Sequence, residues 1–295
     1  MALLPLGTGN DLARVLGWGK GVRFEAIGSH LEALDSARVA LLDRWKVVGS
    51  LPEGGTQQAL SNYMSIGVDA KAALVWARMG KRFPWAFRLR LLNKLWYIVC
   101  GSPEFLQHSY RRLSSRVVLT CDGNPITIPK GIEGIMVCNT PSYGGGSDLW
   151  DETRGAPMPA RLSHFQTEPG IRASMSDGML EVVGVTDVLH LAFSLGGFSN
   201  GVRICQGREL RIVASEGGVP LQIDGEPFNL DEVAYPDGSE PFDVTLSREG
   251  QAMLLARGGD AGTPYSAYAA VEGQLREEGI STQQRDALLR TLSSD

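Results

Sequence analysis

Carboxylates on tight turns are the residues of this 295-residue chain that most directly suggest chemistry. Asp224, Gly225 and Glu226 follow the apolar run 219–223, so two acids stand where a strand is expected to turn. Such a pair can bind a metal ion or accept a proton from an alcohol. Because Asp-Gly is also a common turn dipeptide, the alternative interpretation is a solvated hairpin tip.

A second acid–glycine pair, Asp177-Gly178, precedes the apolar run 180–185. Its carboxylate could ligate Mg²⁺ together with backbone carbonyl oxygens. The simpler interpretation is again a turn that leads into a strand. The four cysteines are widely spaced and the four histidines are scattered, so the sequence indicates neither a zinc site nor a disulfide framework.

Near the start of the chain, the segment Gly7-Thr8-Gly9-Asn10-Asp11 lies between an apolar run and a helical pattern. Glycines let the backbone approach a ligand closely, and free N–H groups at the start of a helix favour an anionic phosphate. The alternative is an ordinary strand-to-helix turn in which Asn10 or Asp11 caps the helix.

Charge is concentrated in residues 71–116, which contain ten Lys and Arg residues and one acid, Glu104. This segment carries a charge of +9 and leaves −14 for the rest of the chain, whose total is −5. Aromatic residues are interleaved with the bases, a combination that suits a helix on anionic lipid, and also suits nucleic acid. Alternatively, the aromatic residues face a core and the bases form a solvated face.

The elements around these residues predict two domains. Residues 1–50 alternate between strands, at 2–6 and 41–48, and helices, one of them with apolar positions from 31 to 39, which is typical of a parallel α/β sheet. A linker rich in Gly and Pro follows near residues 51–55. Beyond it, residues 71–99 have helical spacing interrupted at Pro84, and a capping-box pattern predicts a helical tail near the end of the chain.

Short strands dominate the second domain. They are expected at 117–121, 126–128, 134–138, 180–185, 209–214, 221–223, 242–246 and 252–255. Many short strands separated by Gly and Asp turns argue for an antiparallel sandwich or barrel. No stretch approaches the roughly 18 uninterrupted apolar residues of a membrane-spanning helix, so membrane contact is expected to be peripheral. The widely spaced cysteines fit a reducing, cytoplasmic compartment.

Several segments together carry a resemblance to a known family. They are 4–14 (LPLGTGNDLAR), 42–45 (LDRW), 62–70 (NYMSIGVDA), 93–97 (NKLWY), 141–150, 177–185, 206–209 (QGRE) and 222–227 (QIDGEP). In their amino-acid sequence and in their order along the chain, these segments resemble the eukaryotic diacylglycerol kinases, rather than the sphingosine or ceramide kinases, over residues 1 to about 257.

The resemblance implies a fold of α/β plus all-β class. Residues 1–52 would be the remnant of a parallel-sheet nucleotide-binding domain of the NAD kinase/diacylglycerol kinase type. Residues 58–257 would form the antiparallel, β-sandwich-like accessory domain, and 258–295 a helical tail of unknown role.

The resemblance also implies a reaction, in which ATP and Mg²⁺ are used to phosphorylate diacylglycerol to phosphatidic acid. Gly7, Thr8, Gly9, Asn10 and Asp11 would lie on the nucleotide side. Glu226 would accept the proton of the lipid hydroxyl, with Asp224 beside it. The Asp177 carboxylate, with the carbonyls of Ser174 and Met179, would hold Mg²⁺.

One family motif is missing from the chain. The GGDGT phosphate loop would precede Leu3, where only Met1 and Ala2 stand, so we expect a truncated chain without appreciable kinase activity of its own. The expected partners are diacylglycerol, ATP and an anionic membrane surface, with no nucleic acid. A non-catalytic lipid-binding or interaction module built on the accessory domain is the alternative function.

Overall fold

The computed structural model describes residues 1–7, 9–21, 27–49, 51, 57–82, 113–150, 172–195, 199–214, 219–228 and 242–257. The chain forms two compact units, one of Met1–Leu42 with Gln251–Asp295 and one of Asp43–Gly250. Two long strands, β1 (Arg38–Gly49) and β12 (Phe242–Ala256), contribute residues to both units. The strand expected at 41–48 is formed as part of β1, but it pairs antiparallel with residues 57–60 and not within the expected parallel sheet. The two strands expected at 242–246 and 252–255 are one.

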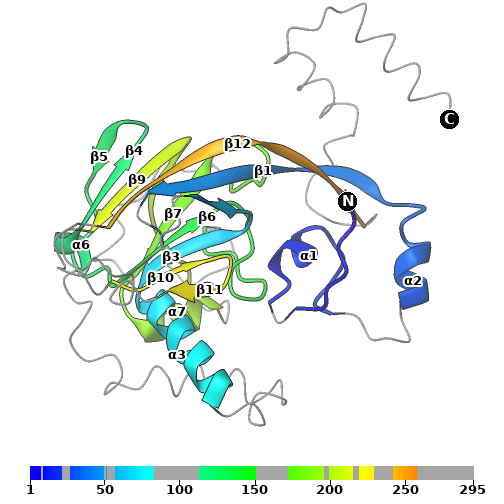
Figure 1. Ribbon diagram of the computed structural model, residues 1–295, viewed down its shortest axis with the longest axis horizontal. Coiled ribbons are helices and arrows are strands. Elements are labelled where there is room, and N and C mark those ends of the chain that lie inside the picture. The colour runs from blue at the N-terminus through cyan, green and yellow to red at the C-terminus, as the bar shows by residue number, and fades with distance from the viewer. Residues whose placement is uncertain are drawn as a thin grey trace, which may run out of the picture. The chain divides into compact units, whose positions relative to one another are not determined.

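Two six-stranded sheets with antiparallel pairings form most of the larger unit (Figure 1). Their strand orders are β2-β1-β12-β9-β4-β5 and β11-β10-β3-β6-β7-β8. The other strands are β2 (Gln57–Leu60), β3 (Tyr63–Gly67), β4 (Val117–Cys121), β5 (Asn124–Ile126), β6 (Gly134–Cys138), β7 (Leu180–Val185), β8 (Val202–Gly207), β9 (Glu209–Ala214), β10 (Leu221–Ile223) and β11 (Glu226–Phe228). The predicted antiparallel β architecture is confirmed.

An apolar core to which both sheets contribute stabilises this unit. It contains Trp45 of β1 and Val244 of β12 from the first sheet, and Met64 of β3 and Val182 of β7 from the second. Along β4, Val117 and Leu119 are buried in this core whereas the intervening Val118 is exposed. The first sheet therefore has one apolar and one solvated face, which explains the alternating sequence of its strands.

The second sheet is buried on both faces. Every residue of β6 and β7 is buried, and their outward side chains, such as Met136 and Val183, belong to a second apolar cluster. Two helices, α3 (Val68–Arg82) and α7 (Val188–Leu195), contribute residues to that cluster. Double-sided burial explains why these strands read as nearly continuous apolar runs.

Hairpin turns of the larger unit follow the Asp-Gly dipeptides. Asp122 and Gly123 join β4 to β5 with φ values of 48° and 79°, so both central residues are left-handed. This is the backbone of a type I′ turn, whose twist matches that of the flanking strands and which glycine adopts without strain. The hairpin predicted from the sequence is confirmed, with a turn of two residues.

The smaller unit contains α1 (Asp11–Val15), α2 (Ile27–Glu32) and the outer ends of β1 and β12. The Trp18 indole N–H donates to the Leu255 carbonyl at 2.5 Å, and the Arg257 N–H to the Leu16 carbonyl at 2.8 Å. The strand expected at residues 2–6 is not formed. Among residues 1–6, all of them described, only Met1 exchanges backbone hydrogen bonds with β12, through Met253 and Leu255. The helix expected around 31–39 ends at Glu32, after which the chain turns.

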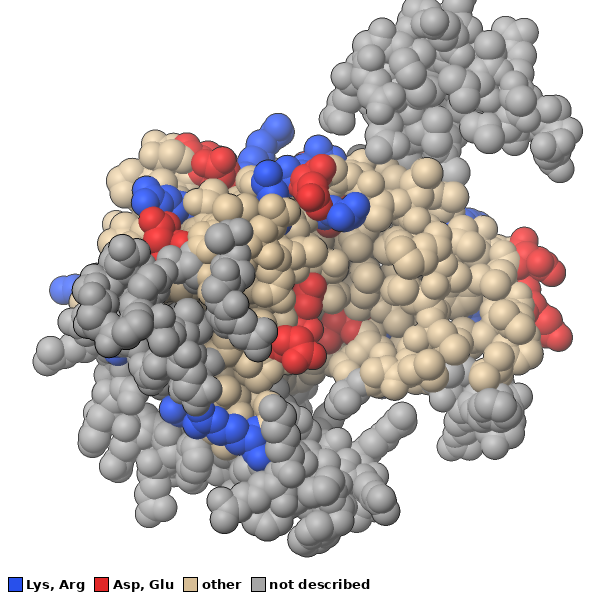
Figure 2. Space-filling view, viewed as in Figure 1, with Lys and Arg blue, Asp and Glu red and all other residues tan. Residues whose placement is uncertain are grey.

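The described surface carries mixed charges over β1 and β12 (Figure 2). Arg44 pairs with Glu249, and Arg211 with Asp243, on side chains more than a third exposed. Such exposed pairs contribute little to stability. No helix of the described residues is long and apolar enough to cross a membrane.

Candidate active site

The predicted catalytic carboxylates lie on the hairpin turn between β10 and β11. Asp224 and Gly225 are its central residues, with φ values of 48° and 88°. The Asp224 N–H donates to the Tyr63 carbonyl at 2.9 Å, and the Gly225 N–H donates to the side-chain oxygen of Gln222 at 2.8 Å. The backbone of the turn is therefore held on both sides by β-sheet residues.

Asp224 uses its carboxylate to hold a neighbouring turn. Its oxygens accept hydrogen bonds from the backbone N–H groups of Ser61 (2.8 Å) and Asn62 (2.7 Å), which connect β2 to β3, and of Tyr63 (3.1 Å), the first residue of β3. Glu226, the first residue of β11, is exposed. Glu226 is thus the more exposed of the two predicted catalytic acids.

The second predicted carboxylate turn, Asp177-Gly178, is held by Asp43 of β1. The fully buried Asp43 carboxylate accepts the Gly178 N–H at 2.6 Å and the Arg248 Nε–H at 2.8 Å. The Asp43 N–H in turn donates to the Met175 carbonyl at 2.7 Å. Sequence reasoning missed this role of Asp43, which was quoted only as part of the segment 42–45.

Asp177 itself accepts the Met179 N–H at 3.0 Å. Burial raises the pKa of the Asp177 carboxyl, and the nearby Asp43 charge adds to the rise, while the Met179 hydrogen bond opposes it. Burial therefore disfavours the ionised form of this carboxyl, a cost that a bound cation would offset. Hard oxygen donors, as Asp177 and the Ser174 and Met179 carbonyls supply, are those that Mg²⁺ prefers, so these residues fit the ion. Within the described residues no cluster of three His, Cys, Asp or Glu side chains suits a metal ion.

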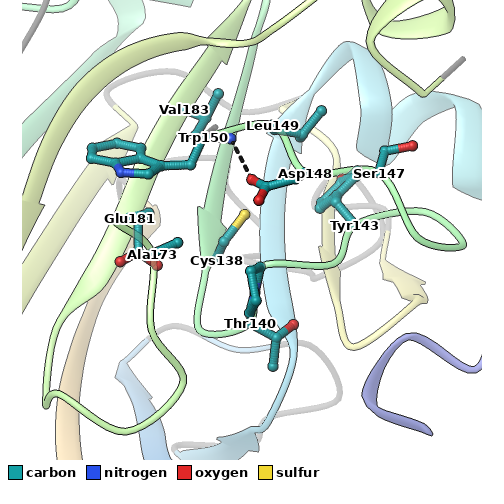
Figure 3. Close-up of a pocket in the computed structure, with 11 residues that line it drawn as sticks. Cys138, Thr140, Tyr143, Ser147, Asp148, Leu149, Trp150, Ala173, Glu181 and Val183 are labelled. Atoms are coloured by element: carbon teal, nitrogen blue, oxygen red, sulfur yellow. Dashed lines mark hydrogen bonds between the residues drawn. The ribbon is translucent and has the colours of Figure 1, made fainter. Parts of the chain in front are cut away.

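A pocket lies between the glycine-rich loop after β6 and strand β7 (Figure 3). The Asp177-Gly178 turn precedes β7 in sequence but is not among the residues that line this pocket. The lining includes Tyr143, Trp150 and Glu181. The Tyr143 ring packs on Tyr63 with centroids 4.3 Å apart, and its hydroxyl donates to the buried Asp69. Because Tyr63 also bonds Asp224 through its backbone, the loop is connected to the β10–β11 turn.

Asp69, at the start of α3, is a buried acid that the sequence gave no reason to single out. It accepts hydrogen bonds from the hydroxyls of Ser65 (2.5 Å) and Tyr143. Burial raises the pKa of the Asp69 carboxyl, and the two hydroxyl donors oppose that rise. Burial, with the Asp69 charge, also raises the pKa of the Tyr143 phenol well above its ordinary value. This pair therefore serves as a hydrogen-bonded support under the loop.

Glu181, on β7, is fully buried at the edge of the pocket. One carboxyl oxygen accepts from the Gln206 amide at 2.7 Å, and the other has no hydrogen-bond partner in the described structure. Burial raises the pKa of Glu181 to about 8, with the charges of Asp177 and Asp148 adding to the rise and the Gln206 bond opposing it. Glu181 therefore holds a proton over much of the physiological pH range.

A pH dependence of stability follows from Glu181. The folded-state pKa, about 8, exceeds the ordinary value of 4.5, so its contribution to stability is greatest below pH 4.5 and is lost as the pH rises through 8. We expect the free energy of unfolding in urea, without divalent ions, to fall by about 3 kcal/mol between pH 5.5 and 8.5. Glu181→Gln should flatten this decrease, whereas the exposed-site control Glu209→Gln should keep it. An unchanged slope in Glu181→Gln would show that other groups cause it.

The glycine-rich segment of the smaller unit is described except for Thr8, which lies outside the described residues. Asn10 has a left-handed backbone, and its side-chain amide donates to the carbonyls of Gly7 (2.8 Å) and Lys20 (2.9 Å). Arg14 donates to the Gly9 carbonyl at 2.8 Å, and Asp11 is buried in the first turn of α1. These contacts tie the segment into a compact turn, and its nucleotide role stays a prediction.

Much of the basic segment 71–116 lies outside the described residues. The described parts are α3, which confirms a helix up to Arg82, and a short helix, α6 (Leu113–Arg116). The predicted interruption at Pro84 and the helical tail after residue 257 also lie outside them.

Comparison with known proteins gives consistent matches. Residues 59–227 match the family model of the diacylglycerol kinase accessory domain. The chain is similar to Diacylglycerol kinase 1 of Arabidopsis thaliana (32% identity, covering 99% of this chain and 39% of the relative). It is also similar to the eye-specific diacylglycerol kinase of Drosophila melanogaster (36%, covering 87% and 17%) and to human diacylglycerol kinase theta (37%, covering 77% and 24%). The chain thus spans well under half the length of these curated relatives.

The fold is similar to a crystal structure of a diacylglycerol kinase from Bacillus anthracis str. Sterne. The TM-score is 0.50 at 15% sequence identity, and the likeness covers 87% of this chain and 69% of that chain. At this identity the likeness concerns the fold alone.

Proposed function

Because the chain belongs to the diacylglycerol kinase accessory-domain family, we propose that it works as part of an ATP-dependent diacylglycerol kinase, which converts diacylglycerol to phosphatidic acid. The single observation that carries the proposal is the extent of the family match. Residues 59–227 include both carboxylate turns, at Asp177-Gly178 and at Asp224-Gly225-Glu226, and the adjoining strands β7 and β10.

The proposed reaction moves the γ-phosphoryl group of ATP to the free hydroxyl oxygen of diacylglycerol. Glu226 accepts the hydroxyl proton, for which its exposed position on a rigid hairpin is suited. Asp224 acts as a positioning residue because its carboxylate holds the β2–β3 turn. The bond from the γ-phosphorus to the bridging oxygen breaks, and ADP leaves.

Mg²⁺ would be held by the Asp177 carboxylate with the Ser174 and Met179 carbonyls, and when bound it would neutralise negative charge. Asp43 keeps this loop in place through the Gly178 N–H. On the nucleotide side we place Gly7, Thr8, Gly9, Asn10 and Asp11, as part of a nucleotide-binding domain to which the smaller unit contributes. Phosphoryl transfer depends mainly on positioning and charge neutralisation, the tasks these groups could perform.

We further propose that the basic segment 71–116 brings the protein to the cytoplasmic membrane surface. Each base near an anionic surface contributes about 1 kcal/mol, so a net charge of +9 should give salt-sensitive binding. In sedimentation with liposomes, we expect the chain to bind vesicles containing phosphatidylserine at low salt and to be released at high salt. Binding that is indifferent to both lipid charge and salt would contradict an electrostatic attachment.

The kinase function can be tested in a domain-exchange enzyme. In this enzyme, residues 38–257 of the chain replace the aligned region of human diacylglycerol kinase theta. These residues include all strands of both sheets. Diacylglycerol, sphingosine and ceramide are offered in turn as acceptors with ATP and Mg²⁺. We expect phosphate transfer to diacylglycerol. A folded enzyme that binds diacylglycerol vesicles without transferring phosphate would favour the lipid-binding module instead.

A further inference from the structure

Asn139, the residue that follows β6, has a completely buried side chain that bonds to two separate parts of the larger unit. Its amide nitrogen donates to the Asp43 carbonyl at 2.9 Å and to the Ser61 carbonyl at 2.6 Å. Its amide oxygen accepts the Trp45 indole N–H at 2.7 Å. The backbone N–H of Asn139 adds a bond to the Asn62 carbonyl at 2.8 Å.

Chemistry fixes the orientation of this amide. An indole N–H can only donate, so the atom that faces Trp45 must be the amide oxygen. Backbone carbonyls can only accept, so the atom that faces Asp43 and Ser61 must be the amide nitrogen. Both N–H donors and the oxygen are used, so no other natural side chain of similar size can make the same three bonds.

The two backbone segments whose carbonyls accept from Asn139 each hold one of the carboxylate turns. Asp43 accepts the Gly178 N–H, next to Asp177, through its side chain. Ser61 and Asn62 donate their N–H groups to the Asp224 carboxylate, next to Glu226. The Asn139 nitrogen donates to both the Asp43 and the Ser61 carbonyl, so that one side chain joins the supports of both turns.

We propose that Asn139 is a positioning residue that couples the Asp177-Gly178 turn to the Asp224-Gly225-Glu226 turn. Asn139 lies too deep to touch a substrate. It acts by keeping β1 at Asp43 and the β2–β3 turn at Ser61 at a fixed separation, so that neither carboxylate turn shifts without the other. The catalytic consequence rests on the proposed kinase function, whereas the mechanical coupling does not.

The coupling can be read from amide hydrogen exchange on the full chain. Asn139→Ala removes all three side-chain bonds, and Trp45→Phe serves as its matched control. Trp45 is equally buried, and its replacement removes one bond to the same amide but leaves the bonds to Asp43 and Ser61. In Asn139→Ala, we expect the amides of Ser61, Asn62 and Gly178 to exchange on the order of tenfold faster, as the loss of single hydrogen bonds implies. In Trp45→Phe the exchange rates of these three amides should all rise by less than about threefold. Thermal melting reports the stability of both variants.

A change confined to one turn, or the same change in both variants, would overturn the coupling. If Asn139→Ala does not fold, Asn139→Ser, which keeps a small polar side chain too short to reach both carbonyls, takes its place with the same expectation. The exchange result stands whether or not the protein is a kinase.

The catalytic arm uses the domain-exchange enzyme. There, Asn139→Ala should lower kcat by at least about tenfold with the KM for diacylglycerol within about threefold, because misplaced groups affect the transition state more than binding. Trp45→Phe should leave kcat near that of the unmodified domain-exchange enzyme. An unchanged kcat in Asn139→Ala, or an equal fall in both variants, would overturn the positioning role. An inactive unmodified domain-exchange enzyme would instead count against the proposed function.

Discussion

Glu226→Gln in the domain-exchange enzyme should lower kcat for phosphatidic acid formation by about 10²- to 10⁴-fold. Glutamine keeps the size of the side chain and removes its ability to accept the hydroxyl proton. Because Glu226 is exposed at the start of β11 and contributes to neither apolar core, the free energy of unfolding should change by less than about 0.5 kcal/mol. Initial rates of phosphate transfer at saturating ATP and diacylglycerol measure the effect.

The matched control for this prediction is Glu209→Gln, which removes another exposed glutamate, on β9 of the other sheet. Its turnover should equal that of the unmodified enzyme. Near-normal turnover in Glu226→Gln would assign the proton acceptor elsewhere, with Asp224 the next residue to test. Asp224→Asn, however, should also loosen the β2–β3 turn, because its carboxylate holds three backbone N–H groups there.

Asp43→Asn should destabilise the chain by about 3 kcal/mol, measured as the free energy of unfolding in urea. The Asp43 carboxylate is completely buried and accepts from both Gly178 and Arg248. An asparagine amide turns an N–H toward one of these donors and leaves the Arg248 charge without its carboxylate. The Arg248 side chain is 32% exposed, which moderates the cost compared with a fully buried ion pair.

Asp243→Asn provides the comparison for Asp43→Asn, since Asp243 also pairs with an arginine, Arg211, through two hydrogen bonds. That pair is exposed, so its loss should cost less than about 1 kcal/mol. Equal losses in the two variants would mean that the buried Asp43 pair has no special part in holding the Asp177-Gly178 turn.

Local features of the larger unit could be predicted from the sequence. Apolar runs bounded by Gly and Asp located β4, β6, β7, β9 and β10 with their observed bounds. Asp-Gly dipeptides marked the hairpin turns at 122–123 and 224–225, because this pair readily adopts left-handed backbone. Both signals act over a few residues, which is the range that a sequence pattern records.

Other features were set by partners distant in sequence. The Asp43 carboxylate accepts a hydrogen bond from Gly178, and the Asp224 carboxylate accepts one from Asn62. Nothing near Asp43 or Asp224 in the chain identifies either partner. Two strands were predicted, at 242–246 and 252–255, but pairing with β9 continues to Ser247 and β12 runs through the residues between them. At residues 2–6, an apolar run alone did not produce a strand, because strands form only where a neighbour supplies a ladder of backbone partners.

The central claim, that this chain supplies the working accessory part of a diacylglycerol kinase, is tested most directly by one rate. This is the initial rate of phosphatidic acid formation by the domain-exchange enzyme, compared with human diacylglycerol kinase theta and with theta lacking the exchanged region. We predict a rate within about tenfold of theta and at least about a hundredfold above the deleted enzyme, since correct placement of catalytic groups has effects of that size. A folded domain-exchange enzyme that is no faster than the deleted enzyme would contradict the claim.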